Sequence, residues 1–236
     1  MLRDAVAIIP ARGGSKRIIK KNIKGFHGEP LISYSIRIAL NSKLFEKVIV
    51  STDDEEIAYI AKKYGAEVPF IRPSEISDDY TGTADVVDHA VEFLESQGES
   101  YTYVCTIYAT APFLQTKYLQ EGYEKLKNCN AVNAFSCTSM PFPIQRTFKI
   151  TENNRCKMFT PEFYFSRSQD LEEAYQDAGQ FYWAKRKLQK ESDKIVFSDI
   201  SIPVILPRYL VQDIDTMEDW IRAEFMYSAL KSSGEL

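Results

Sequence analysis

Histidine is rare in this 236-residue sequence, and paired cysteines are absent. Two histidines are too few for a His-based metal site or a Ser-His-Asp triad. The four cysteines contain no C-x-x-C pair, which argues against a disulfide framework and a zinc site. No apolar run is longer than a strand, and the opening MLRDAVAIIP has an aspartate where a signal peptide has its apolar core. We therefore expect a cytoplasmic protein with no membrane partner.

An excess of positive charge is also missing, yet basic residues gather in one place. The net charge is -4, from 29 Lys and Arg against 33 Asp and Glu. Six of the basic residues fall within positions 12–24, and no acidic residue occurs between Asp4 and Glu29. Because the positive charge forms one patch and not a whole face, the pattern argues against a nucleic-acid partner.

Strand-like and helix-like segments alternate along most of the chain. Buried strands are predicted at 4–9 and 47–52, and further strands at 103–108, 131–138 and 202–206. Helices are predicted at 30–40, 52–65, 83–96, 117–127 and 215–230. The alternation predicts an α/β fold, a mostly parallel sheet with helices on both faces, formed by a single domain over 1–236. In such sheets ligands bind beyond the carboxyl ends of the strands.

Residues 139–182 interrupt this alternation. They contain Pro141, Pro143 and Pro161 and many aromatic residues, but no long helical pattern. We predict an inserted β-rich excursion that carries a subunit contact.

Three details of the helices follow from local pattern. Thr52 with Glu55 three residues later predicts a capping box. Gly122 is expected to interrupt the helix at 117–127 slightly. The last helix is expected to turn one apolar stripe towards the core, made of Met217, Trp220, Ile221, Phe225 and Ala229.

The loop PARGGSKR follows the first predicted strand directly. Gly13 and Gly14 allow backbone N–H groups to approach an anion, and Arg12 and Lys16 flank them with charge. The spacing fits neither G-x-x-x-x-G-K-[ST] nor G-x-G-x-x-G. We predict a phosphate-binding loop, with a solvated basic loop as the alternative.

Asp213 and Asp215 alternate across Ile214 near the other end of the chain. In an extended segment their side chains project to the same side, which suits a divalent cation such as Mg²⁺. The alternative is that Asp215 only caps the last helix.

Two further stretches carry weaker signals. Arg72 and Thr83 flank a polar loop that leads into a helix, where Thr83 is either a helix cap or a nucleotide contact. Arg167 lies among aromatic residues and is expected to bind a carboxylate or to pack on a ring.

Five ordered stretches together resemble one family. They are IIPARGGSKRIIKKN, VSTDDEEIA, RPSEISDD, QDAGQFYW and DIDTMEDW, and they span almost the whole chain. This set resembles the acylneuraminate cytidylyltransferases, also called CMP-sialic acid synthetases. The resemblance implies a Rossmann-like nucleotide-binding fold with a projecting dimerisation segment, and hence a homodimer. It also implies transfer of CMP from CTP to the anomeric hydroxyl of an acidic nine-carbon sugar, with Mg²⁺ and release of pyrophosphate.

The resemblance also implies roles for individual residues. The nucleotide would be bound by Ala11, Arg12, Gly13, Gly14, Ser15, Lys16, Asn22, Arg72 and Thr83. The residues implied in catalysis are Lys21, which would face the phosphates, together with Arg12 and Asp215. Asp213 and Asp215 would hold the metal, and we expect Asp215 to accept the proton of the attacking hydroxyl. The sugar would be bound by Tyr108, Arg167, Gln180 and Tyr182.

Two departures from the family pattern bear on the sugar. The family stretch LQPTSPLR is IYATAPFL here, and INGA is QDAG. This variant resembles the family members that act on pseudaminic acid, and legionaminic and N-acetylneuraminic acids are the alternatives. A function of another class would be an inactive protein that only senses nucleotide, but the intact Lys21, Asp213 and Asp215 argue against it.

Overall fold

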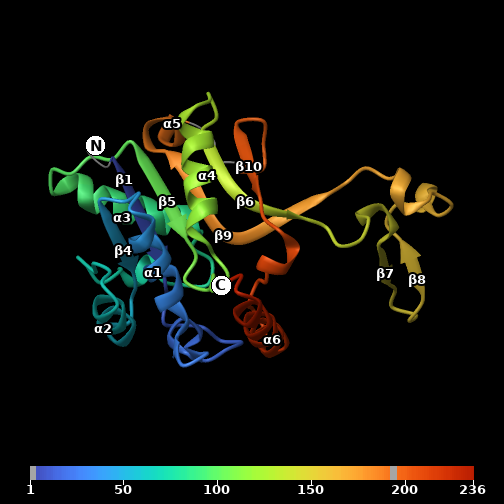
Figure 1. Cartoon of the computed structure of the whole chain (residues 1–236), viewed down its shortest axis with the longest axis horizontal. Helices are drawn as coiled ribbons and strands as arrows, with labels where there is room; N and C mark the ends of the chain where they lie inside the picture. Colours follow the sequence, from blue (N-terminus) through green and yellow to red (C-terminus); the bar gives the residue numbers. More distant parts are fainter. Residues whose placement is uncertain (1–3, 192–195) are drawn as a thin grey trace.

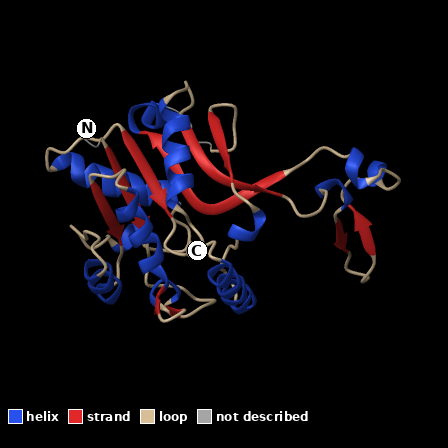
Figure 2. Cartoon of the chain, in the orientation of Figure 1, coloured by secondary structure: helices blue, strands red, loops and turns tan. Residues whose placement is uncertain are grey.

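A six-stranded sheet runs through the body of the computed structural model, which describes residues 4–191 and 196–236 (Figures 1 and 2). Its strand order is β10-β6-β9-β5-β1-β4. The bounds are β1 (Ala5–Pro10), β4 (Lys47–Ser51), β5 (Tyr103–Ile107), β6 (Asn133–Ser139), β9 (Tyr175–Lys185) and β10 (Ser201–Ile205). β1 pairs in parallel with β4 and β5, and β10 pairs in parallel with β6. The prediction of a mostly parallel sheet is confirmed.

Helices cover both faces of the sheet, as predicted. They are α1 (Leu31–Ser42), α2 (Glu55–Lys63), α3 (Thr83–Ser96), α4 (Thr116–Lys127), α5 (Arg186–Glu191) and α6 (Met217–Ser233). Ala5, Ala7 and Ile9 of β1 pack in a core with α1, α2, α4 and α6, whereas Val6 and Ile8 pack with α3 on the opposite face. The alternation of side chains along an extended strand explains this division. None of the helices in the described part of the chain is both long and apolar enough to span a membrane.

Several short elements complete the described chain. Two small hairpins are formed by β2 (Gly25–Phe26) with β3 (Glu29–Pro30) and by β7 (Phe148–Ile150) with β8 (Cys156–Met158). Single helical turns of 3-10 type lie at Lys21–Ile23, Ser74–Ile76, Ile144–Arg146, Pro161–Phe163, Ser168–Asp170 and Arg208–Leu210.

The predicted excursion is shorter than 139–182. Strand β9 begins at Tyr175 and lies inside the central sheet, antiparallel to both β5 and β6. Residues 140–174, which we call the arm, project from the body and carry the β7–β8 hairpin (Figure 1). The backbone N–H of Met140 donates to the carbonyl of Ala174 at 2.8 Å and closes the base of the arm.

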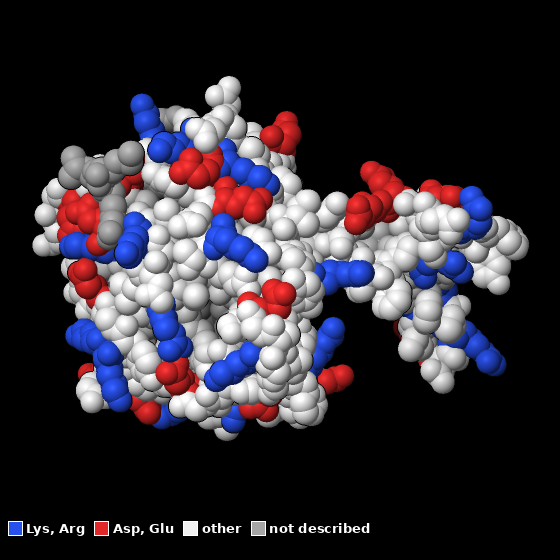
Figure 3. All heavy atoms as spheres, in the orientation of Figure 1, with Lys and Arg blue, Asp and Glu red and all other residues white. Residues whose placement is uncertain are grey.

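The arm exposes large apolar side chains. Phe142, Phe148, Phe159 and Phe165 are all more than half exposed, and Phe165 reaches 92%. On the face drawn in Figure 3, acidic and basic side chains are interspersed over both the body and the arm.

The first turn of α2 corrects one predicted cap. The side chain of Asp54 accepts from the backbone N–H groups of Glu56 and Ile57 at 2.8 and 3.0 Å, so Asp54 is the N-cap. The hydroxyl of Thr52 instead accepts from the N–H of Asp54 at 3.1 Å. Thr52 and Glu55 therefore form no capping box.

Two other predicted caps are also wrong. Thr83 is the first residue of α3, and the preceding Gly82 makes no side-chain cap. At α6 the cap is Thr216, which forms a capping box with Asp219. Because Thr216 caps the helix, the side chain of Asp215 is free to contribute to the site described below.

Helix α6 buries a different stripe from the predicted one. Trp220 is buried as expected, together with Ala223 and Leu230. Met217 and Ile221 are about half exposed and Phe225 is 73% exposed. Apolar residues occupy two rows of this helix, and only the row that begins at Trp220 meets the core.

Gly122 does not interrupt α4, which is continuous from Thr116 to Lys127. A Cβ atom at this position would lie 2.9 Å from Trp183 and 3.0 Å from Phe181. Both aromatic side chains are fully buried. The glycine therefore lets the helix pack closely on β9.

We expect Gly122→Val to lower the free energy of unfolding by about 1–3 kcal/mol, because the added methyl groups overpack a full core. Gly25→Val is the control, since a Cβ atom there meets nothing within 4 Å. Urea denaturation of both variants measures the difference. An equal effect of the two substitutions would contradict the packing role of Gly122.

Candidate active site

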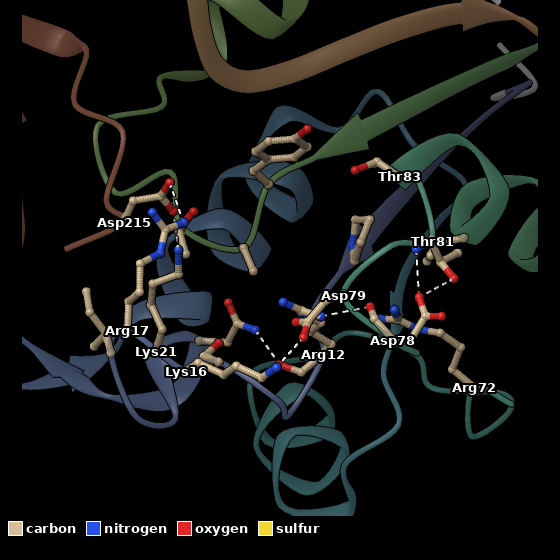
Figure 4. A pocket seen from close by; sticks show the side chains of 18 of the residues that line it. Arg12, Lys16, Arg17, Lys21, Arg72, Asp78, Asp79, Thr81, Thr83 and Asp215 are labelled. Atoms are coloured by element: carbon tan, nitrogen blue, oxygen red, sulfur yellow. Dashed lines mark hydrogen bonds and ion pairs between the residues drawn. The ribbon is translucent and has the colours of Figure 1, made fainter. Parts of the chain in front are cut away.

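An open cavity of about 370 Å³ lies beyond the carboxyl ends of β1 and β5 (Figure 4). Its walls come from the basic loop after β1, the segment before α3, the residues after β5, and Asp215 before α6. This is the edge of the sheet at which the sequence predicted a ligand.

Asp79 forms ion pairs with two cations of the basic loop. Its carboxylate lies 2.7 Å from Nη1 of Arg12 and also pairs with the ammonium group of Lys16. Hydrogen bonds from Lys16 and Arg12 hold the pKa of Asp79 below its ordinary value. Exposed ion pairs of this kind contribute little to stability, so little free energy is needed to separate Asp79 from the two cations.

The loop that carries Asp79 is held in shape by its neighbour Asp78. One carboxylate oxygen of Asp78 accepts from the N–H groups of Tyr80 and Thr81 at 2.9 and 2.7 Å, and from the Thr81 hydroxyl at 2.8 Å. These hydrogen bonds, that from the Thr81 hydroxyl above all, lower the pKa of Asp78. Asp78 thus fixes a tight turn that presents Asp79 to the cavity.

Asp215 forms ion pairs with two other cations of the basic loop. Nη2 of Arg17 lies 2.7 Å from its carboxylate, and Nζ of Lys21 lies 3.1 Å from the other oxygen (Figure 4). Lys21 also donates to the carbonyl of Ile214 at 2.6 Å. Partial burial opposes ionisation of Asp215, but Lys21 and Arg17 outweigh it and lower its pKa.

Asp213 lies two residues before Asp215 and does not line the cavity. Ile214 between them is fully buried. Desolvation and the negative charge of Asp215 raise the pKa of Asp213, as expected for two neighbouring carboxylates. Within residues 4–191 and 196–236, no group of three or more His, Cys, Asp or Glu side chains is arranged to hold a metal. The pair would therefore supply only part of a coordination shell.

Arg72 and Asn22 are buried polar side chains that line the cavity, as does Thr83. Arg72 donates from Nη2 to the carbonyl of Ser51 at 2.6 Å, while its Nε has no hydrogen-bond partner in the described chain. Burial, and the nearby charge of Arg12, lower the pKa of Arg72. Asn22 donates to the carbonyl of Arg12 at 2.9 Å and so braces the basic loop.

Ala11, Gly13 and Gly14 of the loop do not line the cavity. The N–H of Ala11 donates to Ser51, and the N–H of Gly13 donates to Asp53 at 2.9 Å. A Cβ atom on Gly13 would lie 2.7 Å from a carboxylate oxygen of Asp54. Gly14 lies in open space. Six of the residues predicted to contact the nucleotide line the cavity: Arg12, Ser15, Lys16, Asn22, Arg72 and Thr83.

Tyr108 lines the cavity, whereas the other residues predicted to bind sugar do not. Its ring centroid lies 5.3 Å from that of Tyr182. Gln180 is buried and donates to the carbonyl of Leu210 at 2.6 Å. Arg167 lies on the arm, where its guanidinium donates to both oxygens of Asp170 at 2.6 and 2.9 Å.

The sequence did not single out Arg17 or Asp79 as site residues. Both line the cavity, and each forms an ion pair there. A basic loop in an acidic protein needs counter-charges, and the Asp78-Asp79 pair ahead of a helix at the same sheet edge was the available signal.

Known proteins resemble this chain in sequence. A family model described as cytidylyltransferase matches residues 6–221. A pseudaminic acid cytidylyltransferase of Campylobacter jejuni is 50% identical over 222 residues, which cover 94% of this chain and 95% of the relative. A CMP-N,N'-diacetyllegionaminic acid synthase of Legionella pneumophila is 31% identical and covers 93% of this chain and 94% of the relative.

A solved structure resembles the fold. It is a CMP:2-keto-3-deoxy-manno-octonic acid synthetase in complex with CTP, with a TM-score of 0.67 at 16% identity, covering 95% of this chain and 98% of that one. At this identity the likeness concerns the fold. The family model and the relatives, which extend over nearly all of the sequence, identify this chain as a member of the cytidylyltransferase family.

Proposed function

We propose that this enzyme transfers CMP from CTP to the anomeric hydroxyl of pseudaminic acid and releases pyrophosphate. The observation that carries the proposal is the cavity, where one loop gathers four cations between Asp79 and Asp215, and Tyr108 adds an aromatic wall. The 50% identity to a pseudaminic acid enzyme, against 31% to a legionaminic acid enzyme, supports the choice of sugar. The use of CTP favours a reaction in the cytoplasm.

The triphosphate would replace Asp79 between Arg12 and Lys16. An ionised triphosphate carries about four negative charges, and Arg12, Lys16, Arg17 and Lys21 offer four positive ones from a single loop. The nucleoside would extend towards Arg72, whose Nε has no partner in the described chain, and towards the first turn of α3 at Thr83.

The reaction exchanges one phosphorus–oxygen bond for another. The anomeric hydroxyl oxygen attacks the α-phosphorus of CTP, and the bond from that phosphorus to the bridging oxygen breaks. Pyrophosphate leaves with the electron pair, and Asp215 accepts the hydroxyl proton. Because Lys21 and Arg17 lower the pKa of Asp215, it is ionised but is a weak base. Most of the acceleration then comes from positioning and from neutralising charge on the phosphates.

Mg²⁺ is the cofactor that we propose for this site. It prefers oxygen ligands, and Asp213 and Asp215 would hold it. A bound cation would offset the desolvation and the repulsion from Asp215 that together raise the pKa of Asp213. Phosphate and water oxygens would complete the shell. When bound, the ion would neutralise phosphate charge and lower the pKa of the attacking hydroxyl.

We further propose that the arm is a dimerisation segment. Its exposed Phe142, Phe148, Phe159 and Phe165 form apolar surface that pairing with a second copy would remove from water. Arg167 is exposed and lies on the arm. An arginine side chain can bind the carboxylate of a sugar through two parallel hydrogen bonds. We therefore assign Arg167 to the acceptor site of the partner subunit.

The reaction is tested by measuring pyrophosphate release with CTP, Mg²⁺ and four acceptors: pseudaminic, legionaminic, N-acetylneuraminic and 3-deoxy-octulosonic acids. We expect kcat/KM to be at least about tenfold higher with pseudaminic acid. Faster release with another sugar would overturn the sugar assignment. Binding of CTP without release from any acceptor would favour a protein that only senses nucleotide.

Lys21→Ala and Asp215→Asn are each expected to lower kcat by about 10²-fold or more, because each removes a charge held at the reacting phosphates. Asp215→Asn should also raise the Mg²⁺ concentration needed for half-maximal rate, while Lys21→Ala should not. Lys47→Ala is the control, because Lys47 lies at the amino end of β4 and does not line the cavity. A normal Mg²⁺ requirement of Asp215→Asn would contradict the metal assignment.

The place of Arg167 can be tested by mixing two inactive variants, Lys21→Ala and Arg167→Ala. If Arg167 serves the partner subunit, a mixed dimer has one intact site. Random exchange of subunits would then restore about a quarter of the wild-type rate. No recovery, in a mixture shown to contain mixed dimers, would mean that Arg167 does not act on the partner's site.

A further inference from the structure

Strand β9 contains a large irregularity where it passes the cavity. Phe135 of β6 pairs with Tyr182, but Cys137, two residues on, pairs with Asp177, five residues back along β9. The extra residues form a bulge, and Gly179 within it has a φ of 60°, a conformation that favours glycine. Bulges of this kind redirect side chains near functional sites.

The bulge turns Asp177 back towards Tyr182. One carboxylate oxygen of Asp177 accepts from the N–H of Gly179 at 2.9 Å, and the other accepts from the hydroxyl of Tyr182. Burial and the neighbouring Tyr108 raise the pKa of Tyr182, so that its hydroxyl remains a donor at neutral pH. The ring of Tyr182 in turn packs on Tyr108, at a centroid distance of 5.3 Å and an interplanar angle of 47°.

The backbone of Tyr108 is fixed independently of its ring. Its N–H donates to the carbonyl of Gln180 at 2.9 Å, and its carbonyl accepts from the hydroxyl of Ser35 at 2.7 Å. Gln180 is anchored in turn to Leu210, which leads towards Asp213 and Asp215. The side chain of Tyr108 is therefore oriented in the cavity wall by Tyr182, through ring packing and through the interaction of the two hydroxyl groups.

We propose that Asp177 is a positioning residue for acceptor specificity, acting through Tyr182 on the ring of Tyr108. This inference rests on the proposed function. The face of the Tyr108 ring offers no strong hydrogen bond, so contact with that face favours an acceptor whose nearest end is apolar. A hydroxylated end would lose a hydrogen bond to water without gaining one from the protein.

The test is steady-state kinetics of Tyr182→Phe, Asp177→Ala and Asp177→Asn. Tyr182→Phe keeps the ring and removes the hydroxyl, and Asp177→Ala removes the acceptor. We expect each of these two variants to raise KM for pseudaminic acid about tenfold and to leave KM for CTP within about twofold of the wild-type value. The ratio of kcat/KM for pseudaminic acid to kcat/KM for N-acetylneuraminic acid should fall. Asp177→Asn keeps an oxygen that can accept from Tyr182, so its effect should be smaller.

Tyr101→Phe is the matched control. Tyr101 also donates to a carboxylate, that of Glu99, but it lies at the amino end of β5, away from the cavity. We expect no change in either KM. Thermal melting of all variants shows whether they are folded, and Tyr182→Phe, the mildest change, carries the test if Asp177→Ala is unstable.

The outcomes separate this inference from the proposed function. A wild-type enzyme that releases no pyrophosphate with any acceptor overturns the function itself. An active wild type with unchanged acceptor KM in Tyr182→Phe and Asp177→Ala overturns only the role of Asp177. A parallel rise of both KM values would also overturn it, since that indicates a general structural effect.

Discussion

The site depends on how the positive charge of one short loop is balanced. Arg12 and Lys16 pair with Asp79, while Arg17 and Lys21 pair with Asp215, so carboxylates from two distant parts of the sequence hold four cations at the edge of the sheet. Without these partners the cations would repel one another in a partly enclosed space. The pairs of Arg12, Lys16 and Arg17 are exposed and contribute little to stability, whereas Lys21 is mostly buried. The four cations thus line one cavity, each with a carboxylate partner.

The architecture could be predicted where local pattern and tertiary environment agree. Continuous apolar runs identified the central strands, and the loop after the first of them lies beyond the carboxyl ends of the strands, as expected. Caps were less predictable, because Thr52, Asp54, Thr216 and Asp215 all have suitable side chains and only backbone geometry selects among them. The predicted buried face of α6 was wrong for a similar reason. The helix has two apolar rows, and composition does not say which one meets the core.

The acceptor side was harder to predict than the nucleotide side. Phosphate binding uses charge and glycine, which are visible in a short stretch of sequence, whereas the setting of Tyr108 depends on a bulge in a strand some seventy residues later. The sequence alone does not show whether a glycine is needed for backbone flexibility or for close packing. Gly13 and Gly122 are needed for close approach to Asp54 and Trp183, and neither serves mainly as a flexible point.

The position of β9 has a consequence for how the chain folds. Among the described strands, β9 alone pairs with both the β4-β1-β5 half of the sheet and the β6-β10 half. During synthesis, residues up to 139 can form strands that still lack their common neighbour, and the sheet cannot close until residue 185 has been made. The arm is the loop that must be closed at this step, and closure entropy grows only slowly with loop length. Variation in arm length would therefore be tolerated in folding, while slow pairing of β9 would leave two unprotected strand edges open to aggregation.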